Sequence, residues 1–204
     1  MIQSKQDLKF YLFADRYMRY GNKKFGILKR IFFSDLILDY LISMRWTAYY
    51  NNCTDKKRFL SPRFFFHRRR FHKLGVKLGF SIGYNSLGYG AVIPHYGTIV
   101  VNGNAHLGNY CVLHTCTCIA GEGIIGDGLY LATGSIIVYP KLGDYVSVAA
   151  NSLVRHSNNE SYTLMAGSPA VVIRRNYPKW YDRDGRNVII EKIETSKSKY
   201  YTIQ

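Results

Sequence analysis

Aliphatic residues recur at every sixth position through the middle of the chain. The series comprises Val101, Leu107, Leu113, Ile119, Ile125, Leu131 and Ile137, and after a slip of one residue it continues with Leu142, Val148 and Val154. Neither an α-helix, whose faces repeat about every 3.6 residues, nor a strand, whose period is two, explains this spacing. A period of six fits a solenoid with three flat faces, in which one coil takes about eighteen residues. We therefore predict a mainly β fold, a parallel β-helix of about four coils with these side chains inside it.

The hydrophobic pattern before this repeat is helical. Ser4 followed by Asp7 has the form of a capping box, and Gly21 can end the helix that follows. Apolar residues at helical spacing predict a second helix over about residues 34–50. Ser61-Pro62 opens a third helix, which we expect to end before Gly75.

Charge is concentrated at the two ends of the chain. The 28 lysines and arginines against 13 acidic residues give a net charge of +15. The first 80 residues hold 18 basic and 5 acidic side chains (+13), the middle up to residue 173 holds 2 and 4 (−2), and the remainder holds 8 and 4 (+4). We accordingly divide the chain into a basic helical N-terminal region (1–79), a β-helix (80–175) and a basic C-terminal tail (176–204).

The basic run Arg68-Arg69-Arg70 has several readings. No helix-turn-helix, zinc-finger or RNA-binding signature accompanies it, so we expect no nucleic-acid partner. A solvated helix face is the simplest interpretation. Basic helices rich in aromatic residues can also rest on an anionic membrane surface or collect phosphorylated substrates.

The ends and the cysteines give an expectation about location. Residues 1–7 are too polar for the apolar stretch of a signal peptide. The four cysteines form no CxxC pair, and reduced thiols are the default interpretation. We expect a cytoplasmic protein, soluble or peripheral, with contact at the inner face of the membrane as one option.

Several motifs resemble a known family. Residues 93–101 read IPHYGTIVV and closely resemble the histidine-bearing segment of the serine acetyltransferase branch of the hexapeptide-repeat acyltransferases. Residues 126–135 and 143–152 match further stretches, and AGSPA at 166–170 resembles the closing element of the family. The resemblance implies a left-handed parallel β-helix, a homotrimer with active sites between neighbouring prisms, and acetyl-CoA as the donor.

The chemistry of acetyl transfer to a hydroxyl needs a base, because an alcohol is a poor nucleophile at neutral pH. A histidine can take the proton and later return it to the leaving thiolate, and no covalent enzyme intermediate is required. His95 matches the catalytic histidine of the family. A structural histidine on a solenoid corner is the alternative, and the whole matching segment favours the catalytic role.

Acceptor residues are expected near His95. His114 follows it by nineteen residues, so it should face outward on nearly the same face, one coil along. It can line the acceptor pocket or pack in a subunit interface. Tyr96, beside His95, offers a ring on which a sugar can stack.

Donor residues follow from the resemblance. Gly121, Thr133 and Ala150 match the small positions that contact the pantetheine arm of coenzyme A (CoA). Arg174 and Arg175 could hold the CoA phosphates, with a solvated basic tail as the alternative. No metal is expected, because His95, His106 and His114 lack the ligand spacing of the zinc enzymes that share this fold.

Two departures from the family bear on the acceptor. The serine-specific enzymes carry an aspartate immediately before the histidine, where this chain has Pro94. Their longer loop with a basic residue and a histidine is here the short stretch 120–124, which has neither. Both differences count against free L-serine. We therefore expect an O-acetyltransferase acting on a sugar hydroxyl in surface-polysaccharide biosynthesis, with a serine O-acetyltransferase of cysteine biosynthesis as the alternative.

Hypotheses from two other classes stay open. One is a catalytically silent solenoid that serves as a scaffold. The other is a basic adaptor that binds a membrane or a nucleic acid through its helical region.

Overall fold

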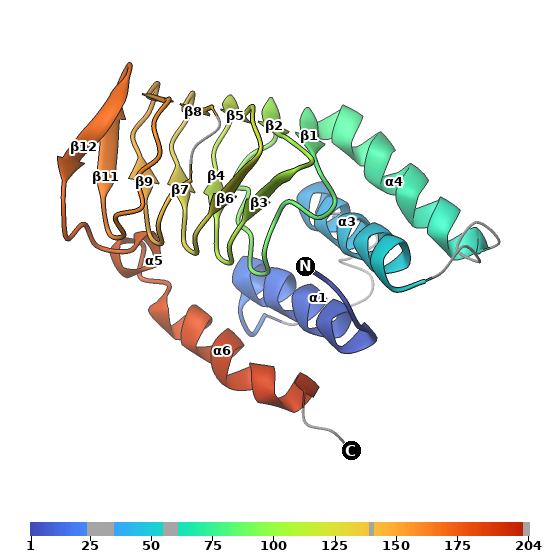
Figure 1. Cartoon of the computed structure of the whole chain (residues 1–204). Helices are drawn as coiled ribbons and strands as arrows, with labels where there is room; N and C mark the ends of the chain where they lie inside the picture. Colours follow the sequence, from blue (N-terminus) through green and yellow to red (C-terminus); the bar gives the residue numbers. More distant parts are fainter. Residues whose placement is uncertain (24–34, 55–60, 139–140, 202–204) are drawn as a thin grey trace.

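The computed structural model describes residues 1–23, 35–54, 61–138 and 141–201 of the chain. A β-solenoid forms most of it, and helices gather at one end (Figure 1). Among the described residues, no helix combines the length and the apolar character needed to cross a membrane.

Three helices form the N-terminal region: α1 (Lys5–Tyr20), α3 (Leu36–Cys53) and α4 (Pro62–Leu78). The capping box is confirmed, because the Ser4 hydroxyl accepts from the Asp7 backbone N–H at 3.0 Å and the Asp7 carboxylate accepts from the Gln3 N–H at 2.9 Å. Gly21 ends α1 as predicted. The side chain of Asp35 caps α3, which runs to Cys53, three residues beyond the predicted end.

The predicted end of the third helix at Gly75 is wrong. Helix α4 continues to Leu78 and stops at Gly79, which has a left-handed conformation. Gly75 serves packing instead, since a Cβ there would lie 2.9 Å from the carbonyl oxygen of Phe80. The glycine therefore lets the last turns of α4 lie close against the first strand.

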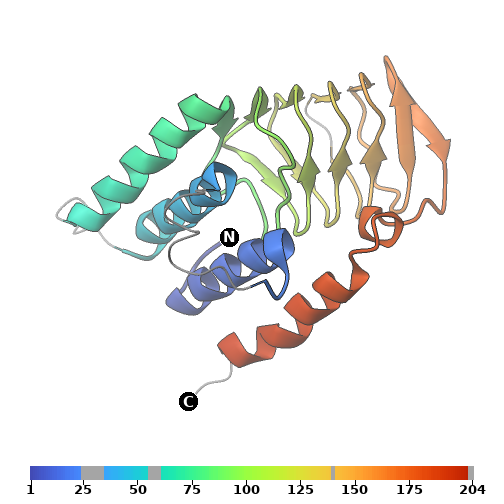
Figure 2. The same cartoon turned by 180° about the vertical axis from the view of Figure 1, so that it is seen from behind.

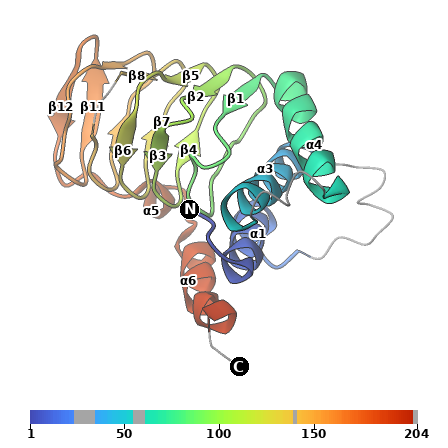
Figure 3. The ribbon, with the colours of Figure 1, turned by 45° about the vertical axis from the view of Figure 1, so that its right-hand side comes forward.

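Parallel strands build the predicted left-handed β-helix (Figure 3). The strands are β1 (Phe80–Ile82), β2 (Ile99–Val101), β3 (Ala105–Leu107), β4 (Val112–Leu113), β5 (Thr117–Ile119), β6 (Gly123–Ile125), β7 (Tyr130–Leu131), β8 (Ile136–Ile137), β9 (Ser147–Val148) and β10 (Leu153–Val154). One face has the order β1-β2-β5-β8-β10, and β3 pairs with β6 on another. The remaining face has the order β12-β11-β9-β7-β4, in which β11 is Leu164–Gly167 and β12 is Ala170–Arg174. Five strands on the first face make about five coils, against the expected four.

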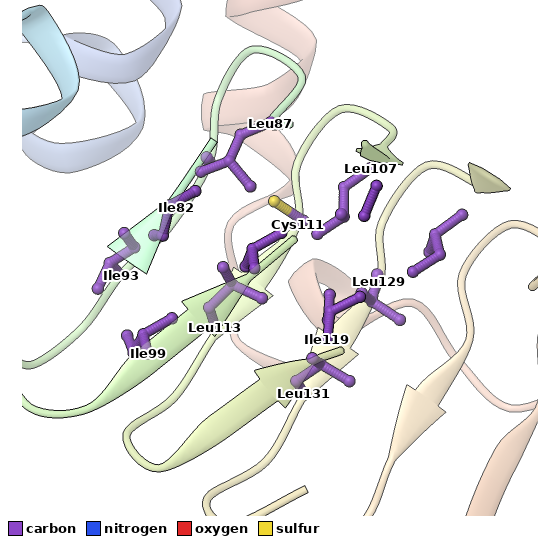
Figure 4. Packing of buried hydrophobic residues seen from close by; sticks show 14 of the residues in the cluster. Ile82, Leu87, Ile93, Ile99, Leu107, Cys111, Leu113, Ile119, Leu129 and Leu131 are labelled. Atoms are coloured by element: carbon purple, nitrogen blue, oxygen red, sulfur yellow. The ribbon is translucent and has the colours of Figure 1, made fainter. Parts of the chain in front are cut away.

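The six-residue series fills the interior of the prism. All ten of its members are buried in one hydrophobic cluster. In register, Val101 lies beside Ile119 and Leu113 beside Leu131, each one coil from its partner. Figure 4 shows Ile99, Ile119, Leu113 and Leu131 pointing into the same interior. The core thus follows directly from the period.

The segment after residue 175 is more ordered than the predicted basic tail. The solenoid closes with the antiparallel pair β11 (Leu164–Gly167) and β12 (Ala170–Arg174), and two helices follow, α5 (Trp180–Arg183) and α6 (Asn187–Tyr201). Helix α6 runs back to lie beside α1 (Figures 1 and 2).

Buried contacts hold this return in place. Trp180 is 2% exposed, and its indole N–H donates to the carbonyl oxygen of Tyr110 at 2.8 Å. Glu194 of α6 accepts a hydrogen bond from the hydroxyl of Tyr89 at 2.9 Å. The C-terminal segment is therefore part of a second hydrophobic core, shared with α1 and the first coils.

Candidate active site

His95 lies in the loop that leads into β2. Its loop is held from two sides: the Gly97 N–H donates to the carbonyl oxygen of Leu78 at 2.9 Å, and the Arg19 guanidinium donates to that of Ile93 at 3.2 Å. The imidazole itself is exposed. The loop fixes the backbone while the ring stays open to a ligand or a neighbouring subunit.

His114 follows β4 and lies near His95. Its ring packs against Tyr130, with 5.2 Å between the ring centroids. Partial burial lowers the pKa of His114 below its ordinary value, and the positive charge that His95 can carry lowers it further, whereas Asp184 acts in the opposite direction. The segments that carry the two histidines lie on neighbouring coils, because the Leu113 N–H donates to the carbonyl oxygen of Val92 at 3.0 Å and the Cys116 N–H to that of Thr98 at 2.7 Å.

A cavity of about 380 Å³ is lined by His114 and by Pro94, the residue before His95, whereas His95 itself is not part of its wall. Three separate parts of the chain line it. The N-terminal helices contribute Asp15, Met18, Arg19, Ile37 and Leu41; the solenoid contributes Ala91, Val92, Ile93, Pro94, Val112, His114 and Tyr130; the C-terminal segment contributes Trp180, Asp184 and Arg186. The wall is mainly apolar with a few polar groups, as in most small-molecule sites.

Two ion pairs neutralise most of the charge on the helical wall. Arg19 pairs with Asp35, the cap of α3. Asp15 pairs with Arg45 at 2.8 Å, and both side chains are 1% exposed. Asp15 also accepts from the Gly90 N–H at 2.9 Å, so this pair joins α1 and α3 to the first coil at the floor of the cavity.

The C-terminal segment brings residues to the cavity that the sequence analysis missed. Arg186 is half-buried and donates to the carbonyl oxygen of Met18 at 3.0 Å. Asp184 is exposed and lies close enough to His114 to influence its pKa. Arg183 lies over the rings of Tyr130 and Tyr177, at 5.0 Å and 4.8 Å. These residues are some 70 positions beyond His114, and no spacing rule connects the two segments.

The predicted donor residues do not all come together within one chain. Thr133 and Ala150 are exposed on neighbouring coils at the solenoid corner that also carries His114, where the Asn151 N–H donates to the carbonyl oxygen of Thr133 at 3.0 Å. Gly121 is buried and follows β5. It therefore lies at the next corner of the coil, between β5 and β6, at the other end of the face to which β5 belongs.

The remaining predicted residues lie on the surface. Arg175 pairs with Glu160 at 2.8 Å, and Arg174 lies 5.5 Å above the ring of Tyr177. Tyr96 is 76% exposed beside His95. Within the described ranges, no group of three or more His, Cys, Asp or Glu side chains could hold a metal ion.

Comparison with known proteins gives the fold a clear context. No protein-family model matches the sequence, and no curated protein matches it. Solved structures of serine acetyltransferases do resemble it. One, in complex with CoA, is 18% identical, with 84% of this chain and 71% of that chain covered and a TM-score of 0.61.

Two further structures agree. Soybean serine acetyltransferase complexed with serine is 18% identical over 82% of this chain and 70% of its own, with a TM-score of 0.63. The enzyme from Neisseria gonorrhoeae is 20% identical over 88% of this chain and 69% of its own, with a TM-score of 0.59. The shared architecture is the left-handed β-helix preceded by helices.

Proposed function

We propose that this protein is an acetyl-CoA-dependent O-acetyltransferase in which His95 is the general base. The observation that carries the proposal is that His95 and His114 lie on neighbouring coils, next to a cavity lined by Pro94 and His114, on a fold shared with serine acetyltransferases. The acceptor hydroxyl belongs to a sugar in surface-polysaccharide biosynthesis. The structure crystallised with CoA supports acetyl-CoA as donor.

The acetyl group passes directly from CoA to the acceptor, without an acyl-enzyme. His95 removes the proton of the acceptor hydroxyl as its oxygen attacks the thioester carbonyl carbon. The tetrahedral intermediate places its negative charge on the former carbonyl oxygen, which backbone N–H groups of the solenoid corner stabilise. Collapse breaks the C–S bond, and the imidazolium of His95 returns the proton to the CoA thiolate.

His114 assists as a neutral group. Because its pKa lies below the ordinary value, its imidazole is uncharged at neutral pH and can hydrogen-bond to the acceptor. Its contact with Tyr130 keeps the ring in one orientation. The exposed ring of Tyr96 offers an aromatic face for a sugar ring.

The donor lies along the corner that carries Thr133 and Ala150, in a homotrimer whose sites form between neighbouring prisms. Gly121 lies at a different corner of its own chain, so in this arrangement it contacts the donor held by a neighbouring subunit. Arg174 and Arg175 bind the CoA phosphates, and Arg175 exchanges its exposed partner Glu160 for phosphate. The exposure of His95 on the isolated chain supports a shared site.

L-serine is the second candidate acceptor. The similar structures are serine acetyltransferases, and one of them is complexed with serine. The basic group missing from the short stretch 120–124 also has a counterpart elsewhere, because Arg186 lines the cavity from the C-terminal segment.

Contact with an anionic membrane at the inner face belongs to the same proposal. Helix α4 has no acidic residue in its first turn, and Phe65 and Phe66 are 50% and 58% exposed. The same helix also exposes the cations Arg63, Arg68, Arg69, Lys73 and Lys77. Each cation near an anionic bilayer contributes about 1 kcal/mol of binding. The protein should float with phosphatidylglycerol vesicles and not with phosphatidylcholine vesicles. This flotation should depend on Phe65 and Phe66 and not on Val188 of α6, which is more exposed than either.

Thiol release from acetyl-CoA tests the activity. The acceptor panel contains L-serine, nucleotide sugars and oligosaccharides. Turnover with a saccharide and not with serine supports the leading assignment, and turnover with serine alone supports the second. If no member of the panel causes thiol release and the protein also fails to bind acetyl-CoA, the result contradicts the proposal and favours a scaffold.

A further inference from the structure

The C-terminal segment closes the cavity beside His114 from the side that the solenoid leaves open. Trp180, Asp184 and Arg186 all line the cavity. Two contacts anchor the segment that carries Asp184 and Arg186. Before them, Trp180 is buried and donates to Tyr110, and after them, α6 packs on α1. The charged groups at 184 and 186 are therefore built into the site.

Arg186 is the cation on the cavity wall whose charge is uncompensated. Arg19 pairs with Asp35. Arg186, in contrast, has no carboxylate within 4 Å in the described parts of the chain. Its Nη1 donates to the carbonyl oxygen of Met18, and a guanidinium carries five N–H donors in a planar fork. The remaining donors suit a planar anion that binds through two oxygens.

The carboxylate of Asp184 limits the charge of the anion that Arg186 can bind. Its carboxylate lies two residues from Arg186 and also borders the cavity. A dianionic phosphate would be repelled by Asp184, whereas a carboxylate carries one charge and can point its other end away. An ammonium group next to the acceptor's carboxylate would in addition be attracted to Asp184.

We infer that the acceptor carries a carboxylate close to the hydroxyl that is acetylated, and that Arg186 binds this carboxylate. This inference rests on the proposed function and defines its acceptor class. Two kinds of molecule share the chemistry: a uronic acid within a saccharide and a hydroxy amino acid. The cavity of about 380 Å³ has room for either.

Equilibrium binding tests the inference without any turnover. Calorimetry or ligand-observed NMR would compare two matched pairs on the wild-type protein: D-glucuronate beside D-glucose, and L-serine beside L-serinamide. In at least one pair the acid should bind about 10- to 100-fold more tightly, the range of a hydrogen bond to a charged group. Equal binding within both pairs would overturn the inference.

Variants assign the effect to Arg186. Arg186→Gln should remove the preference for the acid, and Arg186→Lys should retain part of it because a lysine keeps the charge and loses the fork. Lys192→Gln removes one exposed charge from α6, the helix that begins immediately after Arg186, and should leave the preference intact. A preference that survives in Arg186→Gln with a normal melting temperature would refute the assignment.

The variant Asp184→Asn distinguishes the two kinds of acceptor, the uronic acid and the hydroxy amino acid. It should weaken the binding of L-serine and should not weaken that of D-glucuronate, because only the amino acid carries an ammonium group that Asp184 attracts. Binding of an acid that depends on Arg186, without thiol release, would mean that the transferase proposal fails while the carboxylate site stands.

Discussion

The buried pair Asp15–Arg45 should be the most sensitive polar contact of the fold. Arg45 donates to Asp15 at 2.8 Å and to the carbonyl oxygens of Leu87 and Gly88, each at 2.6 Å. Its guanidinium also lies 4.9 Å from the centroid of the Tyr11 ring. One side chain therefore connects α1, α3 and the first coil.

Removing either partner leaves an uncompensated charge in the interior. Asp15→Leu strands the Arg45 cation, and Arg45→Met strands the Asp15 carboxylate together with two carbonyl groups. Each change should lower the free energy of unfolding by about 3–5 kcal/mol. The double variant removes both charges, so it should cost little more than one single variant, with a coupling of about 3 kcal/mol.

Urea unfolding followed by circular dichroism measures all four proteins of this cycle. The midpoints should fall strongly in both single variants and little further in the double variant. Single-variant losses under about 1 kcal/mol, or a double-variant loss equal to the sum of the two, would refute the reasoning.

Three further predictions concern single residues. Ile137→Ala should lower the free energy of unfolding by about 2–5 kcal/mol, because the Ile137 side chain is fully buried. Ile136→Ala, on the outer surface beside it, should cost under about 1 kcal/mol. Equal losses in the two variants would contradict the inward register. An NMR titration should place the pKa of His114 below the ordinary histidine value, and Asp184→Asn should lower it further by removing a favourable charge; a raised pKa would refute the described surroundings. Trp180→Ala should cost about 3–5 kcal/mol and weaken acceptor binding, because Trp180 anchors the segment that lines the cavity; unchanged melting and binding would show that this anchor is dispensable.

The coils were predictable because each side chain of the six-residue series has the same local environment. Val101, Ile119 and Ile137 occupy the same place in successive coils, so one rule identifies the whole core. The start of α1 was predictable for a similar reason, since Ser4 and Asp7 complete the cap within a single turn.

The C-terminal helices escaped prediction because their partners are distant in sequence. Ile190 and Ile193 of α6 give a short apolar face among many charged residues, which alone does not distinguish a packed helix from a tail. The surface that covers them comes from α1 and the first coils. The predicted end of the third helix at Gly75 failed for the opposite reason. The glycine is a local stop signal, but its close packing against Phe80 outweighs that signal.

Only part of the site could be predicted from the sequence. His95 and His114 could be placed together because the coil length relates them. Arg186 and Asp184 reach the cavity through the return of the chain after β12, a path that depends on tertiary packing. The search for a carboxylate-binding cation at the matched positions therefore missed the one that the fold supplies from elsewhere.

The central claim is that His95 is the base for acetyl transfer. The most direct measurement is thiol release by His95→Asn beside the wild type, with the acceptor that the panel identifies and with acetyl-CoA binding measured on both proteins. The account predicts that turnover falls by about 10²- to 10⁴-fold while the acetyl-CoA dissociation constant stays the same. Turnover that persists near the wild-type rate in His95→Asn would contradict it.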